Sequence, residues 1–309
     1  MDRRSFLQLS VSAGAIAAIA PLSTGCVTSA PVSPLPVSLA KPGRRRIRKG
    51  IMWGTIGAPG SVMDKAKAVK EAGFEGVEPM GGMDVDEMRR ALDATGLKAG
   101  SVCCHTHWAR PLSDPNPEVR KVGLEGLKQS LRDAKSYGAP SVLLVPAVVN
   151  EKVSYADAYV RSQAEIRKAI PLAQELGVKI SIENVWNSFL LGPIEAARYI
   201  DDFGSPFVRW HFDVGNIIHY AWPEQWVRIL GHRIQTLHIK EYSRAKSDKQ
   251  GRWAGFDAEL LKGDNNWPAV MKALDDIGYD GWGIAEQGGG GSLEGLKKLS
   301  REMDQIFAS

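Results

Sequence analysis

A regular alternation of short apolar runs and longer amphipathic segments constrains the fold of this chain more than any other sequence feature. Eight short runs, rich in apolar and β-branched residues, have the composition of buried parallel strands. They occupy residues 50–56, 76–79, 98–104, 141–146, 179–183, 208–213, 234–240 and 282–286. Segments with helical periodicity, several of which begin at proline or end at glycine, follow them. These occupy residues 62–72, 85–94, 117–137, 155–176, 193–203, 223–230, 267–277 and 293–307. Eight strand–helix units predict a (β/α)8 TIM barrel.

A doubly wound open sheet is the alternative fold for such an alternation. It needs a glycine-rich phosphate turn after an early strand, and Gly57-Ala58-Pro59-Gly60 lacks the required spacing. Four glycines at 288–291 precede no Lys-Ser/Thr pair, so we interpret them as a flexible loop rather than a phosphate cradle. We therefore expect one barrel domain over residues 49–309.

The N-terminal 48 residues have the features of an export signal and a linker. Arg3 and Arg4 precede an apolar stretch that is too short to span a membrane, which is typical of a Tat-type signal. Cys26 follows Gly25 as in a lipoprotein cleavage site, and cleavage after Ala40 is the alternative. We expect a signal over 1–26 and a Pro- and Ser-rich flexible tether over 27–48. The protein would be exported to the periplasm or another extracytoplasmic compartment, with a lipid anchor at Cys26.

Charge and cysteine usage narrow the range of partners. The net charge is +4, but 39 Lys and Arg are interspersed with 35 Asp and Glu and form no basic stripe, so we expect no nucleic-acid partner. Membrane contact is expected only through the N-terminal lipid. Cys103 and Cys104 are adjacent on one strand, where their side chains point to opposite faces and do not pair. A homo-oligomer is compatible with this composition, which does not determine the oligomeric state.

The last four expected strands each end in a residue that binds divalent metals well: Glu183, Asp213, His238 and Glu286. In a barrel, the C-terminal ends of neighbouring strands meet at the functional face, so these side chains should converge. Three buried carboxylates are unfavourable unless a cation compensates their charge. Oxygen ligands with one imidazole predict a single divalent ion, with Mn²⁺ preferred and Mg²⁺, Co²⁺ or Zn²⁺ as alternatives.

A second explanation for these carboxylates is a network of salt bridges with Arg209, Lys240 and Arg244. Lys240 also lies on the inward side of its strand, two residues after His238. We therefore expect Lys240 to contact a substrate oxygen.

Three further polar residues lie near the expected functional face. His105 and His107 follow the third strand, and their alternation allows both to enter the pocket. We expect His105 to contact substrate and leave the role of His107 open. Glu78 ends the second strand, where it would bind substrate or orient a metal ligand.

The motifs around the four strand ends resemble those of the xylose isomerase-like TIM-barrel family of sugar isomerases and epimerases. They are Ile182-Glu183-Asn184, Phe212-Asp213-Val214-Gly215-Asn216, Leu237-His238-Ile239-Lys240-Glu241 and Ala285-Glu286. The resemblance covers approximately residues 50–307. It implies that one divalent metal is held at the four strand ends and that Glu183 and Glu286 form the acid/base pair. Asn216 resembles the form found in L-ribulose-phosphate 3-epimerases, and Arg244 matches a substrate-binding arginine of free-sugar epimerases, so both are expected to bind substrate.

The resemblance implies a sugar isomerase or epimerase. A divalent ion bound to a carbonyl and its neighbouring hydroxyl acidifies the intervening hydrogen and stabilises the enediolate, while carboxylates remove and return the proton. Export would bring the protein into contact with unphosphorylated sugars, which we expect as substrates. The alternatives are a lyase that eliminates the substituent of a 3-keto-glycoside, a dehydratase with the same site, and a non-catalytic sugar-binding lipoprotein. The sequence does not determine the sugar.

Overall fold

The computed structural model describes residues 46–309. The expected Tat signal, the lipid-anchor position Cys26 and almost all of the expected tether lie outside the described residues. Within the described part, no helix combines the length and apolar character needed to cross a membrane.

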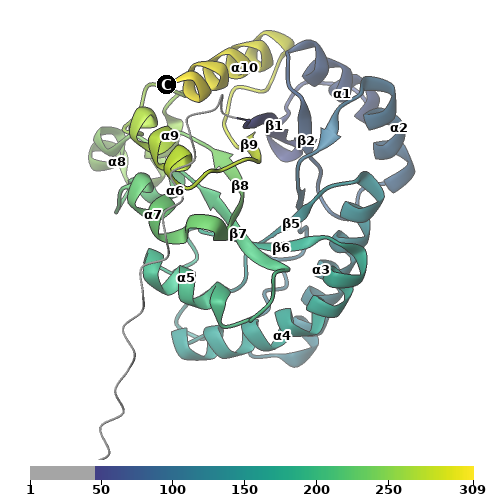
Figure 1. Cartoon of the computed structure of the whole chain (residues 1–309), viewed down its shortest axis with the longest axis vertical. Coiled ribbons are helices and arrows are strands. Elements are labelled where there is room, and N and C mark those ends of the chain that lie inside the picture. Colours follow the sequence, from purple (N-terminus) through teal and green to yellow (C-terminus); the bar gives the residue numbers. More distant parts are fainter. Residues whose placement is uncertain (1–45) are drawn as a thin grey trace, which may run out of the picture. The chain divides into compact units, whose positions relative to one another are not determined.

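The described strands form one parallel sheet around a central axis (Figure 1). They are β1 Arg48–Met52, β2 Gly76–Glu78, β3 Lys98–Ala99, β4 Val102–Cys103, β5 Ser141–Leu144, β6 Lys179–Glu183, β7 Val208–Asp213, β8 Ile234–Ile239 and β9 Trp282–Ala285. The strand order is β3-β2-β1-β9-β8-β7-β6-β5-β4.

The expected third strand closes the barrel in two pieces. β3 pairs with β2, and β4 pairs with β5, with residues 100–101 between them. A parallel bridge between Met80 and Cys103 connects the two sides. The nine strand segments therefore form eight barrel positions, and the predicted TIM barrel is confirmed. Cys103 and Cys104 are free and buried.

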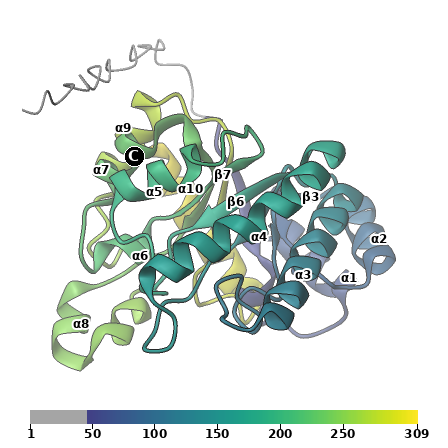
Figure 2. The same cartoon turned by 90° about the horizontal axis from the view of Figure 1, so that it is seen from below.

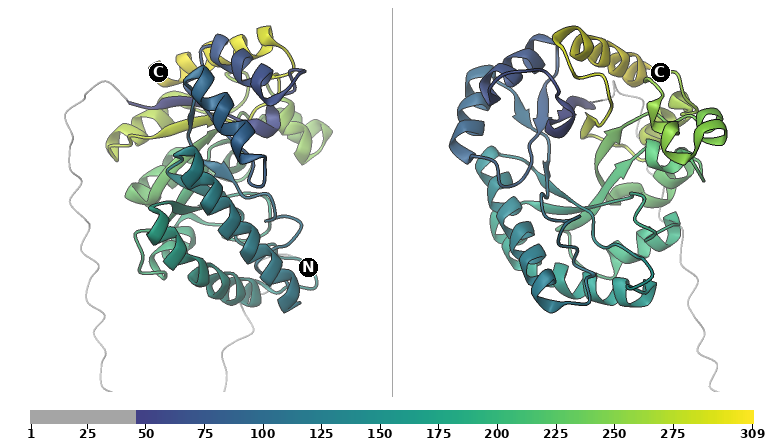
Figure 3. Two further views of the ribbon diagram at one scale, coloured as in Figure 1. Left: turned by 90° about the vertical axis from the view of Figure 1, so that its right-hand side faces the viewer. Right: turned by 180° about the vertical axis from the view of Figure 1, so that it is seen from behind.

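Helices surround the barrel on its outside (Figures 1 and 3). They are α1 Val62–Glu71, α2 Val85–Thr95, α3 Pro117–Tyr137, α4 Tyr155–Leu176, α5 Pro193–Asp201, α6 Gly215–Ile218, α7 Pro223–Leu230, α8 Arg244–Gln250, α9 Trp267–Asp276 and α10 Leu293–Ala308. Three 3-10 turns are η1 Trp53–Thr55, η2 Gly231–Arg233 and η3 Arg252–Asp257. The expected first strand, 50–56, ends early because the Thr55 hydroxyl donates to the Met52 carbonyl and closes η1.

The loops after β7 and β8 contain short elements that the sequence pattern did not predict. α6 follows β7, and α8 with η3 follows β8, so all three lie at the C-terminal end of the barrel. Figure 2 shows α8 projecting away from the ring of helices. These additions change the rim of the barrel mouth, which is where TIM barrels hold their functional residues.

The N-terminal end of the barrel is filled by the side chain of Trp282. A Cβ on Gly76 would lie 2.6 Å from this indole, and a Cβ on Gly100 would lie 2.8 Å from it. Only glycine at these two positions therefore allows the ring to lie inside the barrel. The Arg48 guanidinium covers the same ring at 4.7 Å from its centroid. With this end packed, the C-terminal end is the face at which a site can open.

Candidate metal centre and active site

Four side chains from consecutive strands converge at the C-terminal end of the barrel. Glu183 ends β6, Asp213 ends β7, His238 lies near the end of β8, and Glu286 directly follows β9. One ligand atom from each lies within 4.8 Å of the others. His238 Nδ1 lies 3.1 Å from Glu183 Oε1, 3.3 Å from Glu286 Oε2 and 3.8 Å from Asp213 Oδ2. The structure thus brings together all four predicted ligands, which we call the four-residue cluster.

The imidazole of His238 is oriented by Glu78. His238 Nε2 lies 2.9 Å from Glu78 Oε2, and the Glu78 side chain is fully buried at the end of β2. When Nε2 donates its proton to this carboxylate, the lone pair of Nδ1 faces the cluster. Of the two predicted roles for Glu78, the geometry favours orienting a ligand over contacting substrate.

Two asparagines hold the main chain and carboxylate of Asp213. Asn184 Oδ1 accepts from the Asp213 amide at 3.0 Å, and Asn184 Nδ2 donates to the Asp213 carbonyl at 2.7 Å. The Asn216 main-chain amide donates to Asp213 Oδ1 at 2.8 Å, while its side-chain Nδ2 donates to the Asn184 carbonyl at 2.9 Å. The Asn216 side chain is buried and holds Asn184, which in turn holds Asp213, so its geometry favours a positioning role. Its predicted substrate contact stays a prediction.

Lys240 supplies positive charge beside the cluster. Its Nζ lies 2.6 Å from Glu286 Oε2 and 3.4 Å from Asp213 Oδ2. Burial raises the pKa of Glu183 to about 7 and that of Asp213 to about 6. Burial opposes ionisation of Glu286 too, but the charges of Lys240 and His238 hold its pKa well below the usual value. Likewise, burial disfavours the His238 cation, yet Glu78 and Glu286 raise its pKa well above the usual value.

The donor set fits a divalent cation. Glu183, Asp213 and Glu286, with Glu78 behind them, outnumber the Lys240 ammonium and the His238 imidazolium, so this buried to half-buried place carries an excess of negative charge. Burial, with a smaller contribution from the Glu286 charge, raises the pKa values of Glu183 and Asp213 and so disfavours their ionised forms. A divalent ion would balance the charge, and oxygen ligands with one imidazole nitrogen suit Mn²⁺ or a similar ion.

Arg244 lies at the rim rather than in the cluster. Its guanidinium donates to the carbonyls of Ile218 and Ala221 at 2.9 and 3.0 Å. It thereby holds the loop after β7 against the start of α8, since Arg244 is the first residue of that helix. Its predicted contact with substrate is not visible in this arrangement and stays a prediction.

The two histidines after β4 lie in different environments. His105 is exposed and faces Gly81, on which a Cβ would lie 2.9 Å from the His105 ring. His107 is buried, and its Nδ1 accepts a hydrogen bond from the Val145 amide at 3.2 Å. Burial lowers the pKa of His107 to about 4, so its ring is neutral near pH 7. His107 therefore has a structural partner, whereas His105 is available at the mouth.

Glu241 organises the loop after β8, a role that the sequence did not reveal. This buried carboxylate accepts from the amides of Leu261 and Asn265 at 2.9 and 3.1 Å, and from the Trp267 indole at 3.0 Å. It lies in the motif that contains His238 and Lys240. The sequence shows an acidic residue directly after the inward-pointing Lys240, which marks Glu241 as pointing away from the barrel axis. It does not show the partners Leu261, Asn265 and Trp267, which lie 20 or more residues away in the chain.

His211 lies beneath the cluster and was not assigned a role. It points into the barrel two residues before Asp213, and its ring centroid lies 4.2 Å from that of His238. Among the described residues, neither nitrogen of His211 has a hydrogen-bond partner, and Glu78 Oε1 has none either. Buried polar atoms of this kind are usually satisfied by ordered water or an ion.

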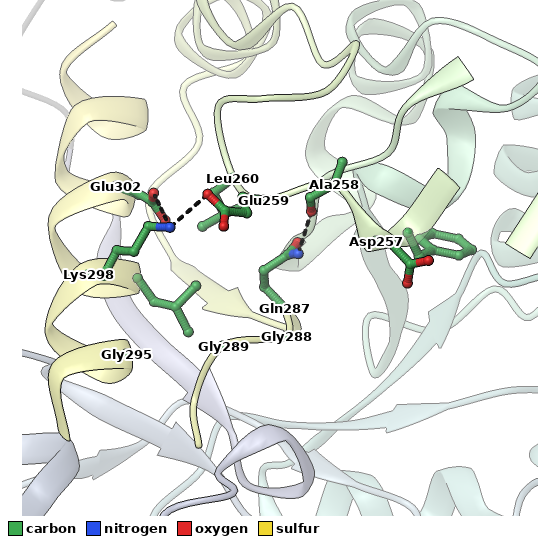
Figure 4. Close-up of a pocket in the computed structure, with 12 residues that line it drawn as sticks. Asp257, Ala258, Glu259, Leu260, Gln287, Gly288, Gly289, Gly295, Lys298 and Glu302 are labelled. Atoms are coloured by element: carbon green, nitrogen blue, oxygen red, sulfur yellow. Dashed lines mark hydrogen bonds and ion pairs between the residues drawn. The ribbon is translucent and has the colours of Figure 1, made fainter. Parts of the chain in front are cut away.

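A pocket of about 330 Å³ lies between the 257–260 loop, the glycines after β9 and α10 (Figure 4). TIM barrels often bind phosphate in this region. Here Asp257, Glu259 and Glu302 line the pocket together with Lys298. Lys298 is paired with Glu259 at 2.7 Å and lies 3.8 Å from Glu302. The excess of carboxylates makes this pocket a poor phosphate site.

Comparisons with known proteins agree with the geometry. A family model described as xylose isomerase-like TIM barrel matches residues 66–304. An L-ribulose-5-phosphate 3-epimerase, UlaE, from Escherichia coli O1:K1 / APEC is 22% identical over 219 residues, which cover 64% of this chain and 74% of that protein.

Solved structures share the fold. A D-allulose 3-epimerase from Methylomonas sp. superposes with a TM-score of 0.71 at 17% identity, covering 85% of this chain and 98% of that one. A 3-keto-D-glucoside 4-epimerase, YcjR, from E. coli superposes with a TM-score of 0.70 at 16% identity, covering 85% of this chain and 100% of that one.

Proposed function

Because the chain belongs to the xylose isomerase-like TIM barrel family, we propose that it is a divalent-metal-dependent sugar isomerase or epimerase. The observation that carries this proposal is the convergence of Glu183, Asp213, His238 and Glu286 within 4.8 Å at the barrel mouth. The relatives and structural neighbours described above are themselves named as sugar epimerases.

The four-residue cluster would hold the ion, whose chemistry is to stabilise negative charge that develops on the oxygens of a bound sugar. Mn²⁺ is the ion we propose, because oxygen donors predominate in the cluster. Asp213 and His238 act as positioned ligands, since the Asn216 main-chain amide and the Glu78 carboxylate fix the orientation of their side chains.

Glu183 and Glu286 form the proton-transfer pair in this proposal. They come from β6 and from the end of β9, which are separated in the sheet by β7 and β8, so they reach a bound sugar from two sides. One carboxylate takes the proton from the carbon beside the carbonyl, and the other returns a proton to the opposite face. Lys240 can donate a hydrogen bond to a sugar oxygen from its place beside Glu286.

We propose unphosphorylated sugars as substrates. The acidic lining of the pocket beside α10 supports this choice, because a phosphate group there would meet Glu259 and Glu302. The twin-arginine signal and Cys26 in the N-terminal segment support export and a lipid anchor, which would place the enzyme where unphosphorylated sugars occur. The named substrate of UlaE is a sugar phosphate, so this proposal separates the chain from that relative.

Solvent deuterium exchange tests the proposal. The protein is loaded with Mn²⁺ and incubated in D₂O with a panel of free ketoses and 3-keto-glycosides, and NMR records incorporation at each carbon. Metal-dependent incorporation with a changed configuration is the expected result. Release of the substituent with an unsaturated keto-sugar would instead identify a lyase, and absence of exchange across the panel would contradict the proposal.

A matched pair of variants links the exchange to the site. With Mn²⁺ added until its content matches that of the wild type, Glu183→Gln should abolish exchange, because the amide cannot accept the proton. Glu259→Gln removes a carboxylate outside the cluster that pairs with Lys298, and it should exchange like the wild type. Equal exchange in both variants would exclude Glu183 from proton transfer.

A further inference from the structure

The exposed aromatic side chains of the described residues all lie at the mouth of the barrel. They are Trp108, Tyr220, Trp222 and Trp253, with exposed fractions of 53%, 43%, 55% and 60%. Each belongs to a loop that follows a strand at its C-terminal end, after β4, β7 or β8. Large aromatic side chains are normally buried, so their restriction to the rim of one site indicates a surface that contacts ligand.

One part of this rim forms a continuous wall. Trp186, Phe256 and Trp253 pack against one another, and we call them the aromatic wall. The ring centroids of Trp186 lie 4.8 Å from those of both Phe256 and Trp253. The half-buried Trp186 and Phe256 form its inner part, and the exposed Trp253 forms its outer part.

The aromatic wall begins at the four-residue cluster. Lys240 Nζ lies 4.9 Å from the Phe256 ring centroid and 2.6 Å from Glu286 Oε2. Trp186 Nε1 donates to the Asn216 carbonyl at 2.9 Å, and Asn216 in turn binds Asp213. The wall therefore leads from the cluster outward to solvent.

The outer part of the wall is held in place before any ligand binds. The buried Tyr242, which follows β8, donates its hydroxyl to the Arg252 carbonyl at 2.8 Å. The Ser243 amide donates to the Gly255 carbonyl at 2.8 Å. A Cβ on Gly255 would lie 2.3 Å from the Tyr242 ring, so glycine allows η3 to pack directly on this anchor. A preorganised surface loses little entropy on binding.

We infer that the substrate of this site is a two-ring glycoside, in which a second sugar ring stacks on the exposed indole of Trp253, which Trp186 supports from the inner side. The inference rests on the proposed function, because it assumes that the reacting sugar occupies the four-residue cluster. A monosaccharide there would leave the outer wall unused. The C–H groups on the face of a second hexose would lie against the electron-rich face of the Trp253 indole. The polar edge of the sugar ring would reach solvent and Arg252, whose guanidinium lies 5.3 Å from the Trp253 ring centroid.

Binding of two unreactive probes to the Mn²⁺-loaded full chain tests this inference. Methyl β-D-glucopyranoside has one sugar ring and methyl β-cellobioside has two, and neither carries a free aldehyde or ketone that could be turned over. Isothermal titration calorimetry should show methyl β-cellobioside binding about tenfold more tightly, which is the scale of one favourable aromatic contact. Trp253→Ala should remove this preference and leave both the Mn²⁺ content and the Kd of the methyl glucoside unchanged.

Trp108→Ala is the matched control. Trp108 is almost as exposed as Trp253, but it follows β4, which lies across the barrel from β8. This variant should keep the preference for methyl β-cellobioside. Trp253→Phe should keep most of it as well, which separates loss of the ring from a general disturbance of η3.

The outcomes distinguish the two proposals. Equal Kd values for the two probes in the wild type, or an unchanged preference in Trp253→Ala, would overturn the two-ring inference while metal-dependent deuterium exchange continued to support the isomerase. Loss of deuterium exchange across the ketose and 3-keto-glycoside panel would overturn the proposed function itself.

Discussion

Replacing Glu183 with glutamine should make the metal-free protein more stable and at the same time weaken its metal binding. Glu183 is 7% exposed at the end of β6, and burial raises the pKa of its carboxyl from 4.5 to about 7. Its charged form is therefore unfavourable in the metal-free fold. Glutamine has nearly the same shape, carries no charge and can still hydrogen-bond His238, which lies 3.1 Å away.

The sign and size of this effect follow from proton linkage. The folded protein takes up a proton that the unfolded chain lacks between pH 4.5 and about 7, so the Glu183 contribution to stability falls as the pH rises through this window. Above pH 7 the full difference, about 3 kcal/mol, opposes folding. Removing this penalty with Glu183→Gln should raise the Tm at pH 8 by about 6 °C or more for a domain of this size. At pH 5 the variant should gain less than about 1 kcal/mol in its free energy of unfolding.

Thermal unfolding of EDTA-treated protein at pH 5 and pH 8 measures this difference. Glu183→Gln is compared with wild type and with Glu259→Gln, which changes an exposed carboxylate. Added Mn²⁺ should raise the Tm of the wild type and of the control variant, and raise that of Glu183→Gln much less. A metal-free Glu183→Gln protein that is no more stable than wild type at pH 8 would refute the argument that burial disfavours the charged form of this carboxylate.

Three further predictions concern the metal site and the barrel. Glu78→Gln should lower the Mn²⁺ affinity measured by calorimetry about 10- to 100-fold, because the neutral amide no longer fixes the His238 imidazole. The circular dichroism spectrum should stay native, and an unchanged affinity would exclude the role of Glu78 in orienting His238. Mn²⁺ affinity should rise between pH 5 and pH 8, since the raised pKa values of Glu183 and Asp213 mean that metal binding displaces protons. Calorimetry in buffers of different ionisation enthalpy would detect these released protons, and a pH-independent affinity would contradict the prediction. Gly76→Ala should destabilise the fold by about 3 kcal/mol or more in urea unfolding, because its Cβ would lie 2.4 Å from the Lys98 carbonyl oxygen; a loss below about 1 kcal/mol would show that the barrel end relaxes.

Much of the barrel could be predicted from local sequence patterns. The bounds of α3, α4, α7, β6 and β7 agree with the expected ranges to the residue. For the three helices, a proline or a capping serine marks the start and a glycine marks the end. The apolar runs of the two strands end at acidic residues, which are Glu183 and Asp213. These signals act within a few residues of the chain, so no tertiary information is needed to recognise them.

The elements of the rim could not be predicted in the same way. α8 and η3 are short and lack a strong apolar pattern, and η3 is held by Tyr242 through contacts to Arg252 and Gly255. The aromatic wall depends on this anchor, since it brings Trp253 to Trp186 across 67 residues of sequence. Local sequence patterns do not predict a contact between residues so far apart in the chain.

The sequence by itself determined the eight strand–helix units and the four candidate metal ligands at consecutive strand ends, because the period of a strand and the parallel order of a barrel place strand ends on one face. Only the tertiary structure showed which hydrogen-bond partners the polar side chains around this site have. Glu78 was expected to bind substrate or to orient a metal ligand, and its carboxylate binds His238. Asn216 was expected to bind substrate; its side chain donates to the Asn184 carbonyl, and its main-chain amide donates to Asp213. These pairings depend on how the barrel curves and join residues far apart in the chain, and for Glu78 the partner is 160 residues away.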